Sequence, residues 1–261
     1  MSAGPASTPY DGVDLVEGAV HLWAGGPGGS RSLAMRPEVA YASAGMGRVV
    51  VAAAFARAVR DGAIDPGERT RLERSRDTGD RGVLATLGGG LNPTWHDLLV
   101  IMLTVEDAEA AIRLCARLGP AAVGDAAQAL GLPPGAMDAY PAAPPRLGAR
   151  VAAAAMSRLA VHAGEDGLAM LLPHMRSVRY RWRVRTRLDE EWVVATAGSR
   201  GRGSVEEVAL WRTAEGWASA AVAMTGVDDP WRAEYVMGDG FRRVVEHIGA
   251  PVADAEGGAG R

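Results

Sequence analysis

The sequence predicts an α+β fold in which strands from both ends of the chain form one antiparallel sheet, with helices packed on it and beside it. Three observations support this class. Two strand-like segments precede residue 43, a helical stretch occupies the middle, and three strand-like segments joined by glycine-containing turns follow residue 191. Distant strands of this kind bury their apolar faces by pairing in a single sheet that the helices then cover.

The N-terminal part is predicted to supply two strands and a helix. Residues 13–23 mix valine, leucine, histidine and tryptophan before a glycine-rich turn, and residues 31–42 supply the returning strand. Residues 47–60 predict a helix because valine and alanine recur on one side of it, and Asp61-Gly62 ends it. The glycines of residues 79–90 predict a loop.

The middle of the chain is predicted to be helical. Thr94 and Asp97 have the spacing of a capping box at a helix start, and residues 98–103 follow without a polar break, which is typical of a buried helix. Further helices are predicted over residues 108–118, 121–130 and 150–162, the last stopped at Gly164, with a proline-rich loop over 133–145.

The C-terminal part is predicted to be a three-stranded meander and a closing helix. The strand-like runs are residues 192–197, 205–213 and 217–225, and the helix covers residues 230–248. Before them, residues 179–187 alternate strictly, so an extended chain places five arginines on one face. This face either is solvated and balanced by the acids at 189–191, or binds an anionic ligand or partner.

Composition limits the classes of function. The formal net charge of the 261 residues is -3, which does not favour nucleic acid or an anionic membrane as a partner. All 28 basic residues are arginine, so any mechanism that needs a neutral lysine is closed to this chain. The single cysteine excludes an internal disulfide, and no Cys/His cluster has zinc spacing.

No secretory signal or apolar segment of about 20 residues is present, so we expect a cytoplasmic protein without membrane association. We also expect no cofactor and no metal. The oligomeric state is left open by the sequence.

Several short motifs together resemble the superfamily of class A β-lactamases and penicillin-binding proteins. Residues 61–64 resemble the family's Ala-Gly-Glu-Ile turn, residues 79–84 its Gly-Ser-Gly-x-Leu loop, and residues 91–99 its Leu-Thr-x-x-Asp-Leu-Leu segment. Residues 103–107, Leu-Thr-Val-Glu-Asp, resemble its Ile-Thr-Val-Ser-Asp. The resemblance implies one domain over residues 12–250, with an α/β part (12–50 and 188–250), a helical part (51–187), and flexible tails at 1–11 and 251–261.

The same resemblance implies that the three catalytic motifs are altered. The family's Ser-x-x-Lys falls on residues 45–48, Gly-Met-Gly-Arg, so that Gly45 replaces the serine and Arg48 the lysine. Ser-Asp-Asn falls on residues 106–108, and Lys-Thr-Gly falls on residues 196–198. Asp138 is the only acid in the loop where the family carries a deacylating glutamate. Glycine has no nucleophilic side chain and arginine is no general base, so serine acylation is expected to be lost.

The first functional hypothesis is a β-lactamase-like protein, a pseudoenzyme, that binds a small molecule or peptide in the residual cleft. Its expected ligand-binding residues are Ser43, Gly45, Arg48, Glu106, Thr196 and Gly198. The second hypothesis is a repurposed lyase, isomerase or cyclase, suited to specialised metabolism, in which Glu106, Asp107 and Arg48 act without a covalent intermediate.

Two further alternatives stay open, a residual hydrolase using Ser43 and a partner-binding protein using residues 179–187. Each candidate residue also has a purely structural explanation. Arg48 and Glu106 can form a salt bridge that only fills space, Ser43 can bond its own turn, and threonines such as Thr196 are common in strands.

Overall fold

The centre of the fold is a five-stranded antiparallel sheet. The computed structural model describes residues 19–27, 31–72, 82–87, 90–162, 164–177, 194–201 and 203–249. The strands are β1 (Ala19–Gly25), β2 (Ser32–Met35), β5 (Val194–Gly201), β6 (Ser204–Thr213) and β7 (Gly216–Thr225), in the spatial order β2-β1-β7-β6-β5. The prediction that strands from both ends of the chain share one sheet is confirmed.

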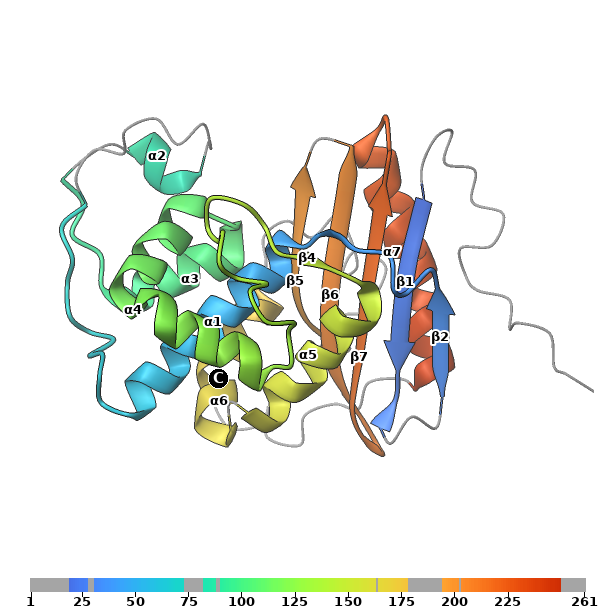
Figure 1. Ribbon diagram of the computed structural model, residues 1–261, viewed down its shortest axis with the longest axis horizontal. Helices are drawn as coiled ribbons and strands as arrows, with labels where there is room; N and C mark the ends of the chain where they lie inside the picture. Colours follow the sequence, from blue (N-terminus) through green and yellow to red (C-terminus); the bar gives the residue numbers. More distant parts are fainter. Residues whose placement is uncertain are drawn as a thin grey trace, which may run out of the picture.

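Helices cover both faces of this sheet. Helix α7 (Pro230–Ile248) lies behind it in Figure 1, whereas α5 (Ala149–His162) crosses its front and the other helices lie beside it. Side chains alternate along each strand, and the buried residues accordingly divide into two clusters. On β6, Val205, Ala209 and Trp211 pack with α7, whereas Val208 and Leu210 belong to the cluster on the helical side.

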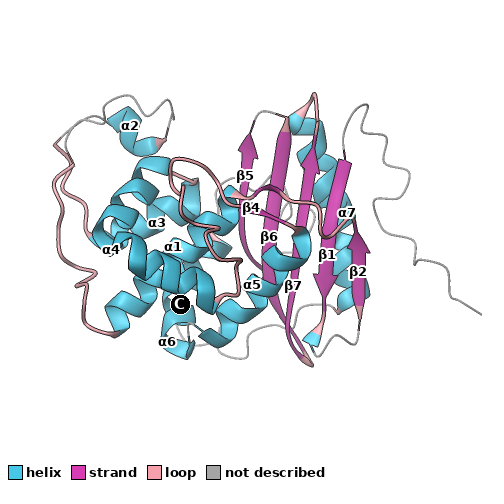
Figure 2. Ribbon diagram, in the orientation of Figure 1, coloured by secondary structure: helices cyan, strands magenta, loops and turns pink. Residues whose placement is uncertain are grey.

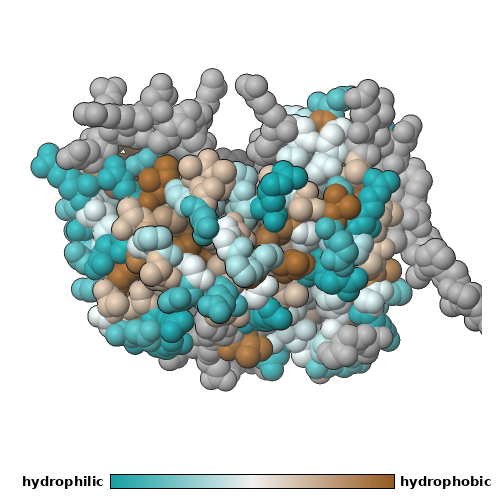
Figure 3. All heavy atoms as spheres, in the orientation of Figure 1, coloured by the Kyte–Doolittle hydropathy of each residue, from teal (hydrophilic) through white to brown (hydrophobic). Residues whose placement is uncertain are grey.

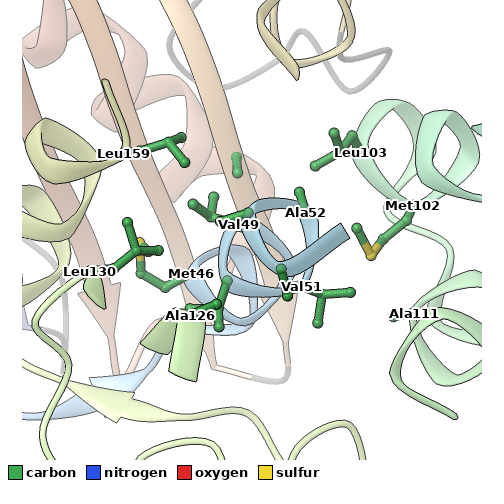
Figure 4. Close-up of a cluster of buried hydrophobic side chains, with 14 of the residues drawn as sticks. Met46, Val49, Val51, Ala52, Met102, Leu103, Ala111, Ala126, Leu130 and Leu159 are labelled. Atoms are coloured by element: carbon green, nitrogen blue, oxygen red, sulfur yellow. The ribbon is translucent and has the colours of Figure 1, made fainter. Parts of the chain in front are cut away.

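Helix α1 (Ala44–Arg60) lies between the sheet and the remaining helices (Figures 1 and 2). All residues from Gly45 to Ala56 are buried, which explains its alanine- and valine-rich sequence. Figure 4 shows Met46, Val49 and Ala52 of this helix among side chains of the surrounding helices. The helix begins three residues before the predicted start, because its first turn is held by tertiary contacts described below.

The helical part beside the sheet contains α2 (Val83–Leu87), α3 (Trp95–Val105), α4 (Ala108–Ala129) and α6 (Gly164–Arg176). The capping box is confirmed: Asp97 N–H donates to Thr94 Oγ1 and Thr94 N–H to Asp97 Oδ2. Helix α4 has a non-helical residue at Gly119 (φ 78°, ψ 158°) before Pro120, so its two parts match the two helices that the sequence predicts.

One local prediction was wrong, and one helix was not predicted. The segment predicted as a loop contains helix α2, whose buried Leu84 donates its N–H to Asp107. The predicted helix over 150–162 does end before Gly164, since α5 ends at His162. A further helix that was not predicted, α6, begins at Gly164, because burial of Leu171 and Met175 against the core outweighs the low helix propensity of glycine.

The returning strand is also interrupted. The backbone turns at Arg36 with a φ of 45°, and the chain resumes as β3 (Tyr41–Ala42), which pairs with β4 (Arg146–Leu147) rather than with the sheet. The short β3–β4 ladder is therefore separate from the five-stranded sheet. Strand β3 leads directly into α1.

On the face drawn in Figure 3, hydrophilic residues are interspersed with small groups of apolar ones. Among the described helices, none combines the length and apolarity needed to cross a lipid bilayer. The predicted tails and the arginine-rich segment 179–187 lie outside the described residues.

Candidate functional site around the Gly45 turn

The turn from β3 into α1 carries two glycines that let it pack tightly on both sides. A Cβ added at Gly45 would lie 2.9 Å from the Ala197 carbonyl oxygen and equally close to the Gly198 backbone. A Cβ at Gly47 would overlap the ring of Tyr140. The first turn of α1 is therefore held between strand β5 and Tyr140, and neither glycine position has room for a side chain.

Glu206 of β6 lies beneath this turn as a buried carboxylate with three donors. Its Oε2 accepts a hydrogen bond from Ser43 Oγ at 2.6 Å. Its Oε1 accepts from the Gly45 N–H at 2.5 Å and from Ser199 Oγ at 2.9 Å. Burial raises the pKa of Glu206 above its ordinary value, while the three hydrogen bonds and the charge of Arg48 act in the opposite direction. The carboxylate thus satisfies the polar groups of the turn inside the core.

Arg48 lies one helical turn after Gly45 and joins three segments of the chain. Its Nη2 donates to the Gly198 carbonyl oxygen of β5 and lies 3.4 Å from Glu106 Oε2. The side chains are only 9% and 13% exposed, so this ion pair is largely shielded from water. Glu106 ends α3 in the left-handed conformation (φ 60°), which directs the chain into α4.

Asp107, the neighbour of Glu106, has a structural role in these contacts. It is the N-cap of α4, where its Oδ1 accepts from the Ala110 N–H at 2.9 Å, and its Oδ2 accepts from the Leu84 N–H at 2.9 Å. The residue is completely buried. Both carboxylate oxygens are therefore engaged by backbone donors that fix the start of α4 and of α2.

The structure brings together some of the predicted site residues and separates others. Gly45, Arg48, Glu106 and the Gly198 carbonyl surround one point between α1, α3 and β5. Ser43 is fully buried and points to Glu206. Thr196 pairs with Ala209, which packs with α7, so alternation places its side chain on the opposite face of the sheet.

Asp138, the acid noted in the 133–145 loop, lies elsewhere. It is exposed and lines a cavity of about 260 Å³ formed by the end of α4 and the following loop. Among the residues that the structure describes, no three His, Cys, Asp or Glu side chains are grouped to hold a metal ion.

Glu206, Ser199 and Tyr140 are the residues of this site that the sequence did not reveal. One signal was available for Glu206, because two consecutive acids interrupt an otherwise apolar strand at residues 205–210. A charged residue on a strand buried on both faces needs partners, and such a residue is a candidate for a polar network. Ser199 and Tyr140 carried no comparable signal.

Solved structures with the same fold include several β-lactamases. A β-lactamase from Sphaerobacter thermophilus DSM 20745 is 22% identical, covers 94% of this chain and 97% of its own, and superposes with a TM-score of 0.76. A β-lactamase from Burkholderia vietnamiensis is 18% identical, with 95% and 99% covered and a TM-score of 0.76. The structure of PBP-A is 19% identical, with 91% and 92% covered and a TM-score of 0.75.

These likenesses confirm the predicted fold. No curated protein matches the chain significantly. The family model described as the β-lactamase enzyme family, Beta-lactamase2, matches residues 15–248. The match covers nearly the whole described structure, and the chain therefore belongs to the Beta-lactamase2 family.

Proposed function

We propose that this chain is a member of the family that forms no acyl-enzyme and acts by binding a small molecule or peptide. The observation that carries the proposal is the packing at Gly45, the position that resembles the family's nucleophilic serine. A Cβ there would lie 2.9 Å from the backbone of β5, closer than ordinary van der Waals contact. The position thus lacks both a nucleophile and the space for one.

The neighbouring groups support the same conclusion. Acyl transfer needs a nucleophile with a base in hydrogen-bond reach and backbone donors aimed at the developing oxyanion. Arg48 remains protonated at working pH, and its guanidinium is engaged by Gly198 and Glu106. The backbone N–H of Gly45, at the start of α1, donates its hydrogen bond to Glu206. Ser43 is adjacent to a carboxylate, but it is 0% exposed and out of reach of a substrate.

Binding at this place would use the polar groups that remain. Arg48 and Glu106 keep a small exposed surface between α1 and α3, and the pair presents both a cation and an anion there. A ligand with a carboxylate or an amine could replace part of this ion pair. The residual cleft is the expected location because the family uses the corresponding region.

Acylation is tested with intact protein and mass spectrometry. We expect no mass increase after incubation with penicillin G or a fluorophosphonate probe, and no hydrolysis of a chromogenic cephalosporin. An active class A β-lactamase treated in parallel is the positive control. A covalent adduct on Ser43, or on any other serine with turnover, would overturn the proposal and favour a hydrolase.

Binding is tested by a thermal-shift screen of small carboxylates, amines and short peptides. The screen is repeated on Arg48→Gln and Glu106→Gln, and a ligand of the residual cleft should lose its effect in both. If every ligand found acts equally on these variants, the cleft is not the binding site. The repurposed enzyme stays a prediction, and loss of turnover of an identified substrate in Glu106→Gln, with the fold intact, would support it.

A further inference from the structure

A second cavity lies in front of the sheet, at the end opposite the β6–β7 turn. It has a volume of about 540 Å³, within the range of small-molecule sites. Its floor is a row of paired residues, since Ala19 and Ser204 both stand opposite Thr225 in the ladder. Its lining residues are Ala19, His21, Arg36, Val39, Ala40, Tyr41, Ala42, Arg146, Ser204 and Thr225.

Two arginines lie at its rim from different segments. Arg36 is exposed at the turn after β2, and Arg146 of β4 is exposed and donates one hydrogen bond, at 2.9 Å, to the Ala40 carbonyl. Neither has an ion-pair partner among the described residues, and no acid is among the described lining residues. The nearby Glu38 is paired with Arg150 at 2.6 Å. Within the described part of the chain, the rim therefore carries two positive charges without an ion-pair partner.

The cavity wall combines apolar surface with neutral polar side chains that are largely buried behind it. Tyr41 is 3% exposed, and its hydroxyl has no hydrogen-bond partner among the described residues. Burial and the nearby charge of Glu206 raise the pKa of Tyr41, so the phenol stays protonated. His21 Nε2 lies 3.0 Å from Thr225 Oγ1, and the His21 and Tyr41 rings lie 5.8 Å apart. Burial lowers the pKa of His21 and outweighs a hydrogen bond to the Arg36 backbone that acts in the opposite direction, so the ring is neutral near pH 7.

We propose that this cavity binds an organic carboxylate, with its anionic group between Arg36 and Arg146 and its apolar body over Val39, Ala40 and Tyr41. Arginine side chains hold a carboxylate through paired N–H donors, and two of them on separate segments form a clamp. The volume exceeds that of a carboxylate alone, which favours a ligand with an apolar body. This site does not include Gly45, Arg48 or Glu106, and it does not depend on the loss of acylation.

The test uses benzoate as the probe and isothermal titration calorimetry on the full chain. Benzamide is the neutral isostere, and inorganic phosphate tests whether the anionic charge alone suffices. We expect benzoate to bind and benzamide to bind at least about tenfold more weakly, since hydrogen bonds to a charged group exceed a tenfold effect. Absence of benzoate binding, or equal binding of benzamide, overturns the proposal, and phosphate binding without benzoate binding overturns the choice of an organic ligand.

Three variants locate the probe. Arg36→Gln and Arg146→Gln should each weaken benzoate at least about tenfold. Arg212→Gln removes the same charge from an exposed position at the other end of β6 and should leave binding unchanged. The proposed site is contradicted if the native protein and the three variants bind benzoate with equal affinity. It is also contradicted if all three variants lose the same amount of benzoate affinity. Arg48→Gln, which tests the residual cleft, should not affect benzoate, so failure of one proposal is distinguishable from failure of the other.

Discussion

Residues 43–48 and residues 36–42 are neighbours in the chain, but their polar groups lie in different environments. At residues 43–48 the chain packs directly against β5, and Glu206 satisfies the polar groups of the turn inside the core. At residues 36–42 the chain lies away from the same face of the sheet and lines an open cavity with two arginines that have no ion-pair partner among the described residues. The closed Gly45 turn and the open cavity are only a few residues apart.

The two regions differ in the space around their polar groups, since the Gly45 turn is packed against β5 whereas residues 36–42 line a cavity of about 540 Å³. At the Gly45 turn, glycine, a buried carboxylate and an ion pair leave no open space between the turn and β5. The polar residues of the closed turn therefore have a structural explanation in the contacts that they make. In the open cavity, His21 contacts Thr225 and Arg146 donates to the Ala40 carbonyl. Arg36 and Arg146 have no ion-pair partner among the described residues, and a few polar groups converging on a cavity are typical of ligand sites.

Removal of the Glu206 carboxylate should have the largest effect on stability. Glu206→Ala leaves the Gly45 N–H and two serine hydroxyls without a buried acceptor, and we expect a loss of about 3 kcal/mol or more in the free energy of unfolding. Urea denaturation followed by circular dichroism measures it.

Glu206→Gln is the matched control for that substitution. The amide keeps the shape, accepts from Gly45 and donates to Ser43, so we expect a loss of about 1 kcal/mol. Equal losses in the two variants would show that the hydrogen-bond network does not account for the effect.

The next largest effect is expected for a side chain at Gly45. Gly45→Ala forces a methyl group against the backbone of β5, and we expect a loss of about 1–3 kcal/mol. Gly124→Ala on α4 is the control, because a Cβ there meets nothing within 4 Å, and it should be neutral or slightly stabilising.

The double variant Gly45→Ser with Arg48→Lys sharpens the same comparison, because it recreates the family's Ser-x-x-Lys motif. We expect it to be destabilised and to form no penicillin adduct in intact-protein mass spectrometry. An adduct on Ser at position 45 would mean that the turn opens readily and is not closed by packing.

Stability should also depend on pH through Glu206. Its folded pKa is raised, so the folded state binds more protons than the unfolded state between the ordinary glutamate pKa, about 4.3, and the raised value. The Glu206 contribution therefore falls as pH rises through this window, by at most about 1.4 kcal/mol per pH unit. The free energy of unfolding of the native protein minus that of Glu206→Gln, measured from pH 4 upward, should decrease; a constant or rising difference contradicts the assignment.

The smallest effect is expected in the open cavity. Arg146→Gln removes one exposed hydrogen bond to Ala40 and should change the free energy of unfolding by less than about 0.5 kcal/mol. A loss comparable to that of Glu206→Ala would show that Arg146 has a structural role and would remove the contrast between the two regions.

Much of the fold followed from local patterns in the sequence. Alternation and glycine turns located the strands of the C-terminal meander, the Thr94–Asp97 capping box fixed the start of α3, and Gly119-Pro120 located the break in α4. Helices α2 and α6 were missed because their short or glycine-containing sequences are weak helix formers. Burial of Leu84, Leu171 and Met175 in the tertiary structure stabilises them instead.

The sequence by itself determined which side chains the Gly45 turn offers: Gly45 has none, Arg48 is an arginine, a residue type that does not act as a base, and the chain contains no lysine. It also identified Arg48 and Glu106 as a candidate pair, and in the structure Arg48 Nη2 lies 3.4 Å from Glu106 Oε2. Only the tertiary structure decided that Glu206 closes the turn, that Thr196 faces the other side of the sheet, and that Arg36 and Arg146 share a cavity. The physical reason is that strand register and the packing of distant segments bring these groups together, and neither is encoded in local spacing.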